Sequence, residues 1–263
     1  MRKKMTAALL ALTLLCTGLL SGCVTADPSD GSGDKGITVA ISSDTGTMDP
    51  AGSIALTYLA YSVSALDELL TYDENGKIEY RAAESYEVND DSTVWTFHLR
   101  EDALWSDGSP VTSADFMNTI TRALDPASGS GYANYLFPIE NAEAVYNGEA
   151  DMDSLGVETP DDHTIVFHLA EPCVYFLDLL RLPVYTPSCS EYADSVDSGW
   201  DRDPGTSLSN GPFCLAEYVP DQYFVLEKNK YYWNADAINL DTITYRFFDD
   251  TQSMANAYEA GEV

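Results

Sequence analysis

The clearest pattern along the chain is the alternation of apolar and polar residues at 93–99. Apart from Val94, the apolar residues Trp95, Phe97 and Leu99 occupy every second position, so they share one face of an extended strand. Short runs rich in β-branched or aromatic residues predict further strands. These runs lie at 37–41, 164–169, 224–227 and 243–248. We expect the first of them, which leads into a turn-prone segment, to be a buried strand.

A helix is predicted to begin near residue 56, because apolar residues recur there at spacings of three and four and would share one buried face. Turn-forming sequences follow at 73–76, with Asp-Glu-Asn-Gly, and at 105–108, with Trp-Ser-Asp-Gly. We expect the helix to pack on a sheet through this apolar face. The residues of the face are Leu56, Leu59, Val63, Leu66 and Leu70.

A second predicted helix has explicit start and stop signals. Thr112 and Asp115 form a capping-box pair, and the Asp-Pro sequence at 125–126 ends the helix. An apolar segment at 174–182, closed by Pro183, predicts a third and shorter helix. Because strands and helices interleave along the chain, the fold class is α/β or mixed α+β. The buried face of the second helix consists of Phe116, Ile120 and Leu124.

The N-terminus has the pattern of a secretion signal. Three basic residues at 2–4 precede an apolar stretch at 7–20, which is too short to span a bilayer comfortably as a mature helix. The stretch ends in the sequence LSGC at 20–23, which resembles the lipobox of bacterial lipoproteins. This resemblance implies that Cys23 carries lipid and holds the protein at a membrane surface. A signal cleaved after a small residue, with Cys23 there by chance, is the alternative.

The chain therefore divides into a signal peptide at 1–22, a flexible tether at 23–36 and a folded part at 37–263. The tether is rich in Gly, Ser and Asp and has too few apolar residues to fold. The chain has 43 acidic and 13 basic residues, a net charge of −30, which falls to −33 once the three basic residues of the signal are removed. Such a surface repels polyphosphates and argues against nucleic-acid binding. A hydrophobic content of 45% indicates a real core.

The sequence offers no recognisable catalytic or metal-binding motif. Cys173, Cys189 and Cys214 remain after the signal and the anchor, and their spacing lacks the close pairs of zinc sites. They can form one disulfide and one free thiol, or three free thiols. His163 and His168 are five residues apart on a predicted strand and should project to opposite faces. No nucleophile in a Gly-x-Ser-x-Gly frame and no Gly-rich phosphate loop is found. We expect no enzyme activity, no cofactor and no bound metal.

Three sequence blocks resemble the peptide-binding proteins of ABC importers. The most specific block lies at 94–116 and joins VWTFHLR to WSDGSPVTSADF. The second joins SNGPF at 209–213 to LEKNKYYW at 226–233. The third is TMDP at 47–50, where the family usually has Leu before Asp-Pro. The segments most similar to the oligopeptide-binding branch of the family are 131–136 and 155–164.

The resemblance implies a periplasmic-binding-protein-like clamp of two lobes that encloses an extended peptide. The peptide main chain would pair like an added strand, so affinity depends little on side-chain sequence. Positions 54–56 match the family's loop after Asp-Pro, which lies along the peptide backbone. Position 132 matches an aromatic residue that faces the cleft, and positions 210–211 match a turn at the lobe interface. The alternatives are that the residue at 56 only begins a buried helix face and that the turn is only structural. The implied ligand-binding residues are Ile54, Ala55, Leu56, Tyr132, Asn210 and Gly211.

The implied function is extracytoplasmic capture of oligopeptides and their delivery to the permease subunits of an ABC importer. We expect a lipid-anchored monomer, on the cell surface or the periplasmic side of a bacterial membrane. The chain stops where members of the family continue, so we expect 37–263 to contain mainly the first lobe of a truncated clamp. A peptide sensor or adhesin with the same clamp is one alternative, and a binder of a nickel chelate, haem or a sugar is another. An exported hydrolase is disfavoured because no nucleophile, base and orienting group assemble in the sequence.

Overall fold

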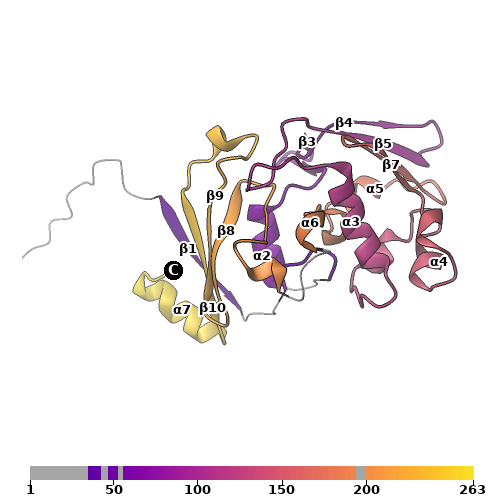
Figure 1. Ribbon diagram of the computed structural model, residues 1–263. Helices are drawn as coiled ribbons and strands as arrows, with labels where there is room; N and C mark the ends of the chain where they lie inside the picture. Colours follow the sequence, from indigo (N-terminus) through magenta and orange to yellow (C-terminus); the bar gives the residue numbers. More distant parts are fainter. Residues whose placement is uncertain (1–34, 43–46, 53–55, 194–198) are drawn as a thin grey trace, which may run out of the picture. The chain divides into compact units, whose positions relative to one another are not determined.

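The computed structural model describes residues 35–263 except 43–46, 53–55 and 194–198, and these residues contain two four-stranded sheets (Figure 1). The strand order of the first sheet is β1-β10-β9-β8. β1 is parallel to β10, whereas β9 is antiparallel to both of its neighbours, β10 and β8. The strands of this sheet are β1 (Gly36–Ser42), β8 (Phe213–Val219), β9 (Tyr223–Lys228) and β10 (Thr242–Phe248).

The strand predicted at 37–41 is confirmed as β1, but the expectation that it is buried is wrong. β1 stands at the edge of the first sheet with a single neighbour, β10. Its residues are exposed or half-buried, and Ile37 is 45% exposed. A β-branched run indicates an extended backbone, whereas burial depends on which elements cover the strand.

The second sheet has the strand order β4-β5-β7-β6 and is antiparallel throughout. The predicted alternation is confirmed in β5, where Trp95, Phe97 and Leu99 are buried and the residues between them are half-buried. Phe97 meets Phe167 of β7 edge to face, with ring centroids 5.9 Å apart. The strands are β4 (Ala83–Val88), β5 (Val94–Leu99), β6 (Val157–Asp161) and β7 (Thr164–His168).

A short hairpin of β2 (Leu70–Tyr72) and β3 (Ile78–Tyr80) precedes the second sheet. The turn predicted at 73–76 is confirmed as its connection. The Asp73 carboxylate accepts hydrogen bonds from the backbone N–H groups of Asn75 and Lys77. Gly76 has a φ of 75°, a left-handed conformation that favours glycine.

The helix predicted from residue 56 is confirmed as α2 (Leu56–Ala65), but its predicted buried face is only partly right: Leu66 and Leu70, which follow the helix, are buried, whereas Leu59 and Val63 on it are not. Tyr58, Tyr61 and Ala65 are buried, whereas Leu59 is 43% and Val63 is 72% exposed. The sequence alone could not reveal this, because two tyrosines form the inner face and donate or accept hydrogen bonds there. α2 packs against β1 and β8, and α7 (Thr251–Ala260) lies on the other side of the first sheet (Figure 1).

The second predicted helix is confirmed as α3 (Ser113–Leu124). The Asp115 carboxylate accepts the Thr112 backbone N–H at 2.9 Å, as the capping-box pair predicts, and the helix ends at the expected Asp-Pro sequence. The same carboxylate accepts a hydrogen bond from Trp105 Nε1 at 3.2 Å. α3 is therefore fixed at its start by a residue that also joins it to the preceding turn. Its predicted inner face, Phe116, Ile120 and Leu124, is buried.

The helix predicted at 174–182 is mostly wrong. Only α5 (Phe176–Leu179) is α-helical, and Val174 before it is 93% exposed. Pro183 begins a 3-10 turn, and Leu182 before it is extended, as a residue that precedes proline prefers to be. The remaining short helices are α4 (Ala142–Tyr146), α6 (Ser190–Ala193), η1 (Ala133–Leu136), η2 (Met152–Ser154), η3 (Pro183–Tyr185), η4 (Trp200–Arg202) and η5 (Ala235–Ala237).

Candidate functional site

The loop at 47–52, which contains the Asp-Pro motif, is held from α3 by a two-pronged ion pair. Arg122 donates to both carboxylate oxygens of Asp49 at 2.7 Å. The Arg122 Nε also donates to Asn118 Oδ1 at 3.0 Å, and a terminal nitrogen donates to Ser188 Oγ at 3.2 Å. All three guanidinium nitrogens thereby donate hydrogen bonds, which fixes the position of Arg122 and of the loop that it holds.

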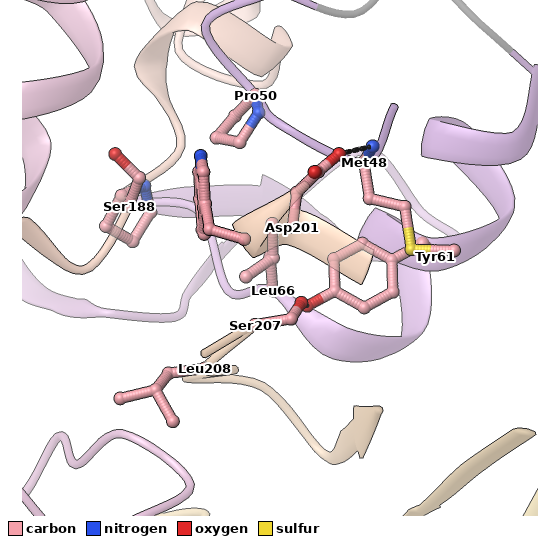
Figure 2. Close-up of a pocket in the computed structure, with 10 residues that line it drawn as sticks. Met48, Pro50, Tyr61, Leu66, Ser188, Asp201, Ser207 and Leu208 are labelled. Atoms are coloured by element: carbon pink, nitrogen blue, oxygen red, sulfur yellow. Dashed lines mark hydrogen bonds between the residues drawn. The ribbon is translucent and has the colours of Figure 1, made fainter. Parts of the chain in front are cut away.

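A second carboxylate, Asp201 of η4, holds the same loop from another direction. It is 5% exposed and accepts hydrogen bonds from the Met48 backbone N–H and, at 2.8 Å, from the Thr47 hydroxyl (Figure 2). A small cavity beside these groups offers about 10 Å³ to water, which is room for about one molecule. Tyr61 of α2 lies in its wall, with its hydroxyl 3.1 Å from Ser207 Oγ. The space next to the loop is therefore filled by protein, and the loop itself is rigidly supported.

The turn that contains Asn210 and Gly211 lies against the end of α2. The Asn210 side chain accepts the Asp67 N–H at 2.9 Å and donates to the Asp67 carbonyl at 3.0 Å. The Gly211 N–H donates to the Ala65 carbonyl at 2.9 Å, and a Cβ at Gly211 would lie only 2.7 Å from the Ala65 carbonyl carbon. The Asn210 side chain thus pairs with the Asp67 backbone as another backbone segment would. Gly211, which has no side chain, permits the turn to approach the Ala65 backbone closely.

Asp67, whose backbone Asn210 holds, is a buried carboxyl beside cationic and aromatic groups. It is 3% exposed, and Trp233 Nε1 donates to its Oδ2 at 2.9 Å. Burial raises the pKa of Asp67 to about 6, although the Trp233 hydrogen bond and the charges of Arg81 and Arg100 act in the opposite direction. Arg100 covers the Trp233 ring at 3.8 Å. The cluster joins the hairpin, the second sheet and the segment after β9.

Tyr132 stands immediately before η1 and is half-buried. Its ring lies beside that of Tyr135, with centroids 5.6 Å apart, and Tyr135 is 40% exposed. The Tyr185 hydroxyl donates to the Tyr135 carbonyl at 3.0 Å, which fixes this turn on the core. Tyr132 therefore offers part of an aromatic surface from a supported position.

The six predicted ligand-binding residues meet different outcomes. Ile54 and Ala55 lie outside the described residues, and Leu56 is the first residue of α2. Asn210 is 4% exposed, and its amide is occupied by Asp67. Contact of these residues and of Tyr132 with a ligand stays a prediction.

Sequence reasoning missed Arg122 and Asp201, which hold the loop at 47–52, and Asp67, which binds Asn210 in the turn. One signal was present in the sequence. Arg122 lies in the last turn of a helix whose apolar residues predict a buried face, so an acidic partner for Arg122 was to be expected. Its partner, 73 residues away in sequence, was not predictable.

Among the described residues, no group of three His, Cys, Asp or Glu side chains is placed to hold a metal ion. His163 precedes β7 instead of lying on it, and His168 Nε2 is 3.1 Å from Glu158 Oε1. Cys173, Cys189 and Cys214 are free thiols, which decides between the two cysteine states left open by the sequence. In the part of the chain that the structure describes, no helix has both the length and the apolar character needed to cross a membrane.

Comparison with solved structures defines the class of protein. Haemophilus influenzae OppA in complex with RPPGFSPFR matches with a TM-score of 0.82 at 30% sequence identity, over 88% of this chain and 45% of that one. The mixed α/β unit is therefore part of the fold of periplasmic peptide-binding proteins, as the sequence predicts. The chain belongs to the bacterial extracellular solute-binding proteins, family 5, whose model matches residues 77–263.

Curated relatives agree with this family. The periplasmic oligopeptide-binding protein OppA of Escherichia coli is 34% identical over 223 residues, which cover 84% of this chain and 41% of that protein. A probable deoxycholate-binding periplasmic protein, YgiS of Escherichia coli, is 33% identical over 223 residues, with coverage of 84% and 42%. The chain thus spans less than half the length of these relatives.

Proposed function

We propose that this chain is the first-lobe part of a solute-binding protein that captures oligopeptides outside the cytoplasm for an ABC importer. The observation that carries the proposal is the doubly held loop at 47–52, fixed by Arg122 and Asp201. A rigid loop in front of residues 54–56 would present an ordered backbone edge to an extended peptide, and such pairing costs less when the edge is already ordered. The names of two relatives, oligopeptide-binding proteins of Escherichia coli and Haemophilus influenzae, support the same ligand class.

The proposal includes the residues expected to contact the peptide. Ile54, Ala55 and Leu56 would lie along its main chain, and Tyr132 would offer an aromatic face. Asn210 and Gly211 would act through the position of the turn that they form, because the Asn210 amide is already occupied by Asp67. A second lobe, which would correspond to the part of the relatives that this chain does not cover, would close over the peptide.

Lipid anchoring, permease contact and a monomeric state are part of the same proposal. Cys23 would hold residues 23–36 as a tether at the outer side of a bacterial membrane. A binding role without catalysis is supported by the family, whose members are binding proteins.

The alternative with a specific observation behind it is a different ligand. A relative at 33% identity has the name of a probable deoxycholate-binding protein, so a steroid acid is a reasonable competitor of peptides. Titration calorimetry of the full-length protein tests the proposal, with a mixed peptide pool in one arm and deoxycholate, nickel chelate, haem and sugar in the others. We expect heat of binding from the peptide pool only. Binding of another ligand alone, or hydrolysis of peptides during the titration, would overturn the proposal.

A further inference from the structure

The outward face of α2 borders a second hollow, which the loop at 47–52 does not use. Its lining offers about 210 Å³ to water, enough for a side chain of several heavy atoms. One wall is apolar and is formed by Leu59 and Val63, the two α2 residues that the sequence wrongly predicted to be buried. Pro183 and Thr186 also line the hollow. The hollow therefore exposes apolar surface to solvent at a place where a folded chain would normally cover it.

The hollow also contains a half-buried carboxylate. Glu68 lines it, and burial raises the pKa of Glu68 to about 6. No side chain of the described residues forms a hydrogen bond or an ion pair with this carboxylate; only its own backbone N–H interacts with it directly. A half-buried carboxylate without a side-chain partner in the described part of the chain is a group that a ligand cation would stabilise.

The charged groups around Glu68 do not neutralise it by contact. The adjacent Asp67 adds a like charge, and Arg81 and Arg181 act on Glu68 only through space. Arg181 is exposed, lines the same hollow and faces the Tyr72 ring at 5.5 Å. The net charge of −30 gives the whole chain a preference for cations in its surroundings.

We propose that this hollow, lined by Leu59, Val63 and Glu68, is a subsite for a lysine or arginine side chain of the bound peptide. The apolar stem would lie along Leu59 and Val63, and the charged end would reach the Glu68 carboxylate. The inference rests on the proposed function, because it assumes that a peptide is the ligand. It makes the protein selective for basic peptides in spite of the main-chain pairing, which by itself is indifferent to sequence.

The test is calorimetry of the full-length protein with alanine tetrapeptides that carry lysine, norleucine or glutamate at each position in turn. Norleucine keeps the apolar stem of lysine and lacks its charge, so the ratio of the two dissociation constants isolates the contribution of the ligand's charge. At one position we expect lysine to bind roughly tenfold tighter than norleucine, and glutamate to bind most weakly. In Glu68→Gln the lysine advantage should disappear.

Two further variants make the result specific. Glu74→Gln changes an exposed glutamate in the β2–β3 turn, and it should retain the lysine advantage. Arg181→Ala removes the nearby positive charge and should increase that advantage severalfold, which gives an independent measurement if Glu68→Gln does not fold. If no tetrapeptide binds at any position, the proposed function fails. If peptides bind but the lysine advantage is absent, survives Glu68→Gln or is unchanged in Arg181→Ala, only the subsite is overturned.

Discussion

Arg122 of α3 and Asp49 of the loop after β1 form a two-pronged ion pair in which both N–O distances are 2.7 Å. Their side chains are 22% and 18% exposed, so water screens the pair only in part. The ion pair links the loop that follows β1 of the first sheet to α3, which packs against β6 of the second sheet. It is thus a fixed connection between elements that are distant in sequence.

We expect Arg122→Gln to lower the free energy of unfolding by about 2 kcal/mol, because Asp49 would be left half-buried without its cationic partner, with only the Ala51 N–H, among the described residues, still bonded to it. Peptide affinity should fall as well, since the loop in front of 54–56 would lose one of its two supports. Urea unfolding and calorimetry of the full-length protein measure the two effects. Arg246→Gln is the matched control: its ion pair with Glu262 is exposed, and its loss should cost less than about 1 kcal/mol. Equal losses in the two variants would contradict the role given to Asp49 and Arg122.

The buried Asp67 carboxyl predicts a pH dependence of stability. Its pKa is raised from 3.8 to about 6, so between these values the folded state binds more protons than the unfolded state. The free energy of unfolding should therefore decrease as the pH rises from about 4 to above 6, by up to roughly 3 kcal/mol. Glu68, whose pKa is raised to about 6 as well, contributes in the same direction.

Asp67→Asn should flatten this dependence, because the amide keeps the shape of the carboxyl and does not titrate. Urea unfolding at a series of pH values measures it, with Glu74→Gln as the control that should follow the parent. Parallel curves for the parent and Asp67→Asn would show that Asp67 does not carry the effect.

Tyr132→Ala tests the aromatic contact with the ligand. We expect peptide affinity to fall about tenfold, as for an aromatic residue at the centre of an interface. Stability should fall by only about 1 kcal/mol, because Tyr132 is half-buried and loses mainly its ring contact with Tyr135. Tyr135→Ala removes the same ring contact from the other side and should leave affinity closer to that of the parent. Equal affinity losses would mean that Tyr132 has no ligand contact of its own.

Cys23→Ser tests the lipid anchor. Without the thiol no lipid can be attached, so the protein should move from the membrane fraction to the soluble fraction of the cell envelope. Membrane fractionation with an immunoblot measures the change, and Cys214→Ser, at a free thiol in β8, is the control that should stay with the membrane. Identical fractionation of Cys23→Ser and the parent would exclude the lipobox.

Local sequence was sufficient wherever the signal and the structure involve the same few residues. The alternation of Trp95, Phe97 and Leu99 gave β5, since side chains two apart must share a face. Thr112 and Asp115 gave the start of α3, since a capping box closes within one helical turn. The motif blocks were equally local, and they were enough to identify the family.

Only the tertiary structure decided which surfaces are covered and which distant groups meet. α2 buries Tyr58 and Tyr61 instead of Leu59 and Val63, because other segments of the same chain supply hydrogen-bond partners, Thr186 and Ser207, for the tyrosine hydroxyls. The contact of Asn210 with Asp67 spans 143 residues, and no periodicity reports on such a separation. Sequence patterns describe a segment in isolation, whereas burial and long-range pairing depend on every element that packs against it.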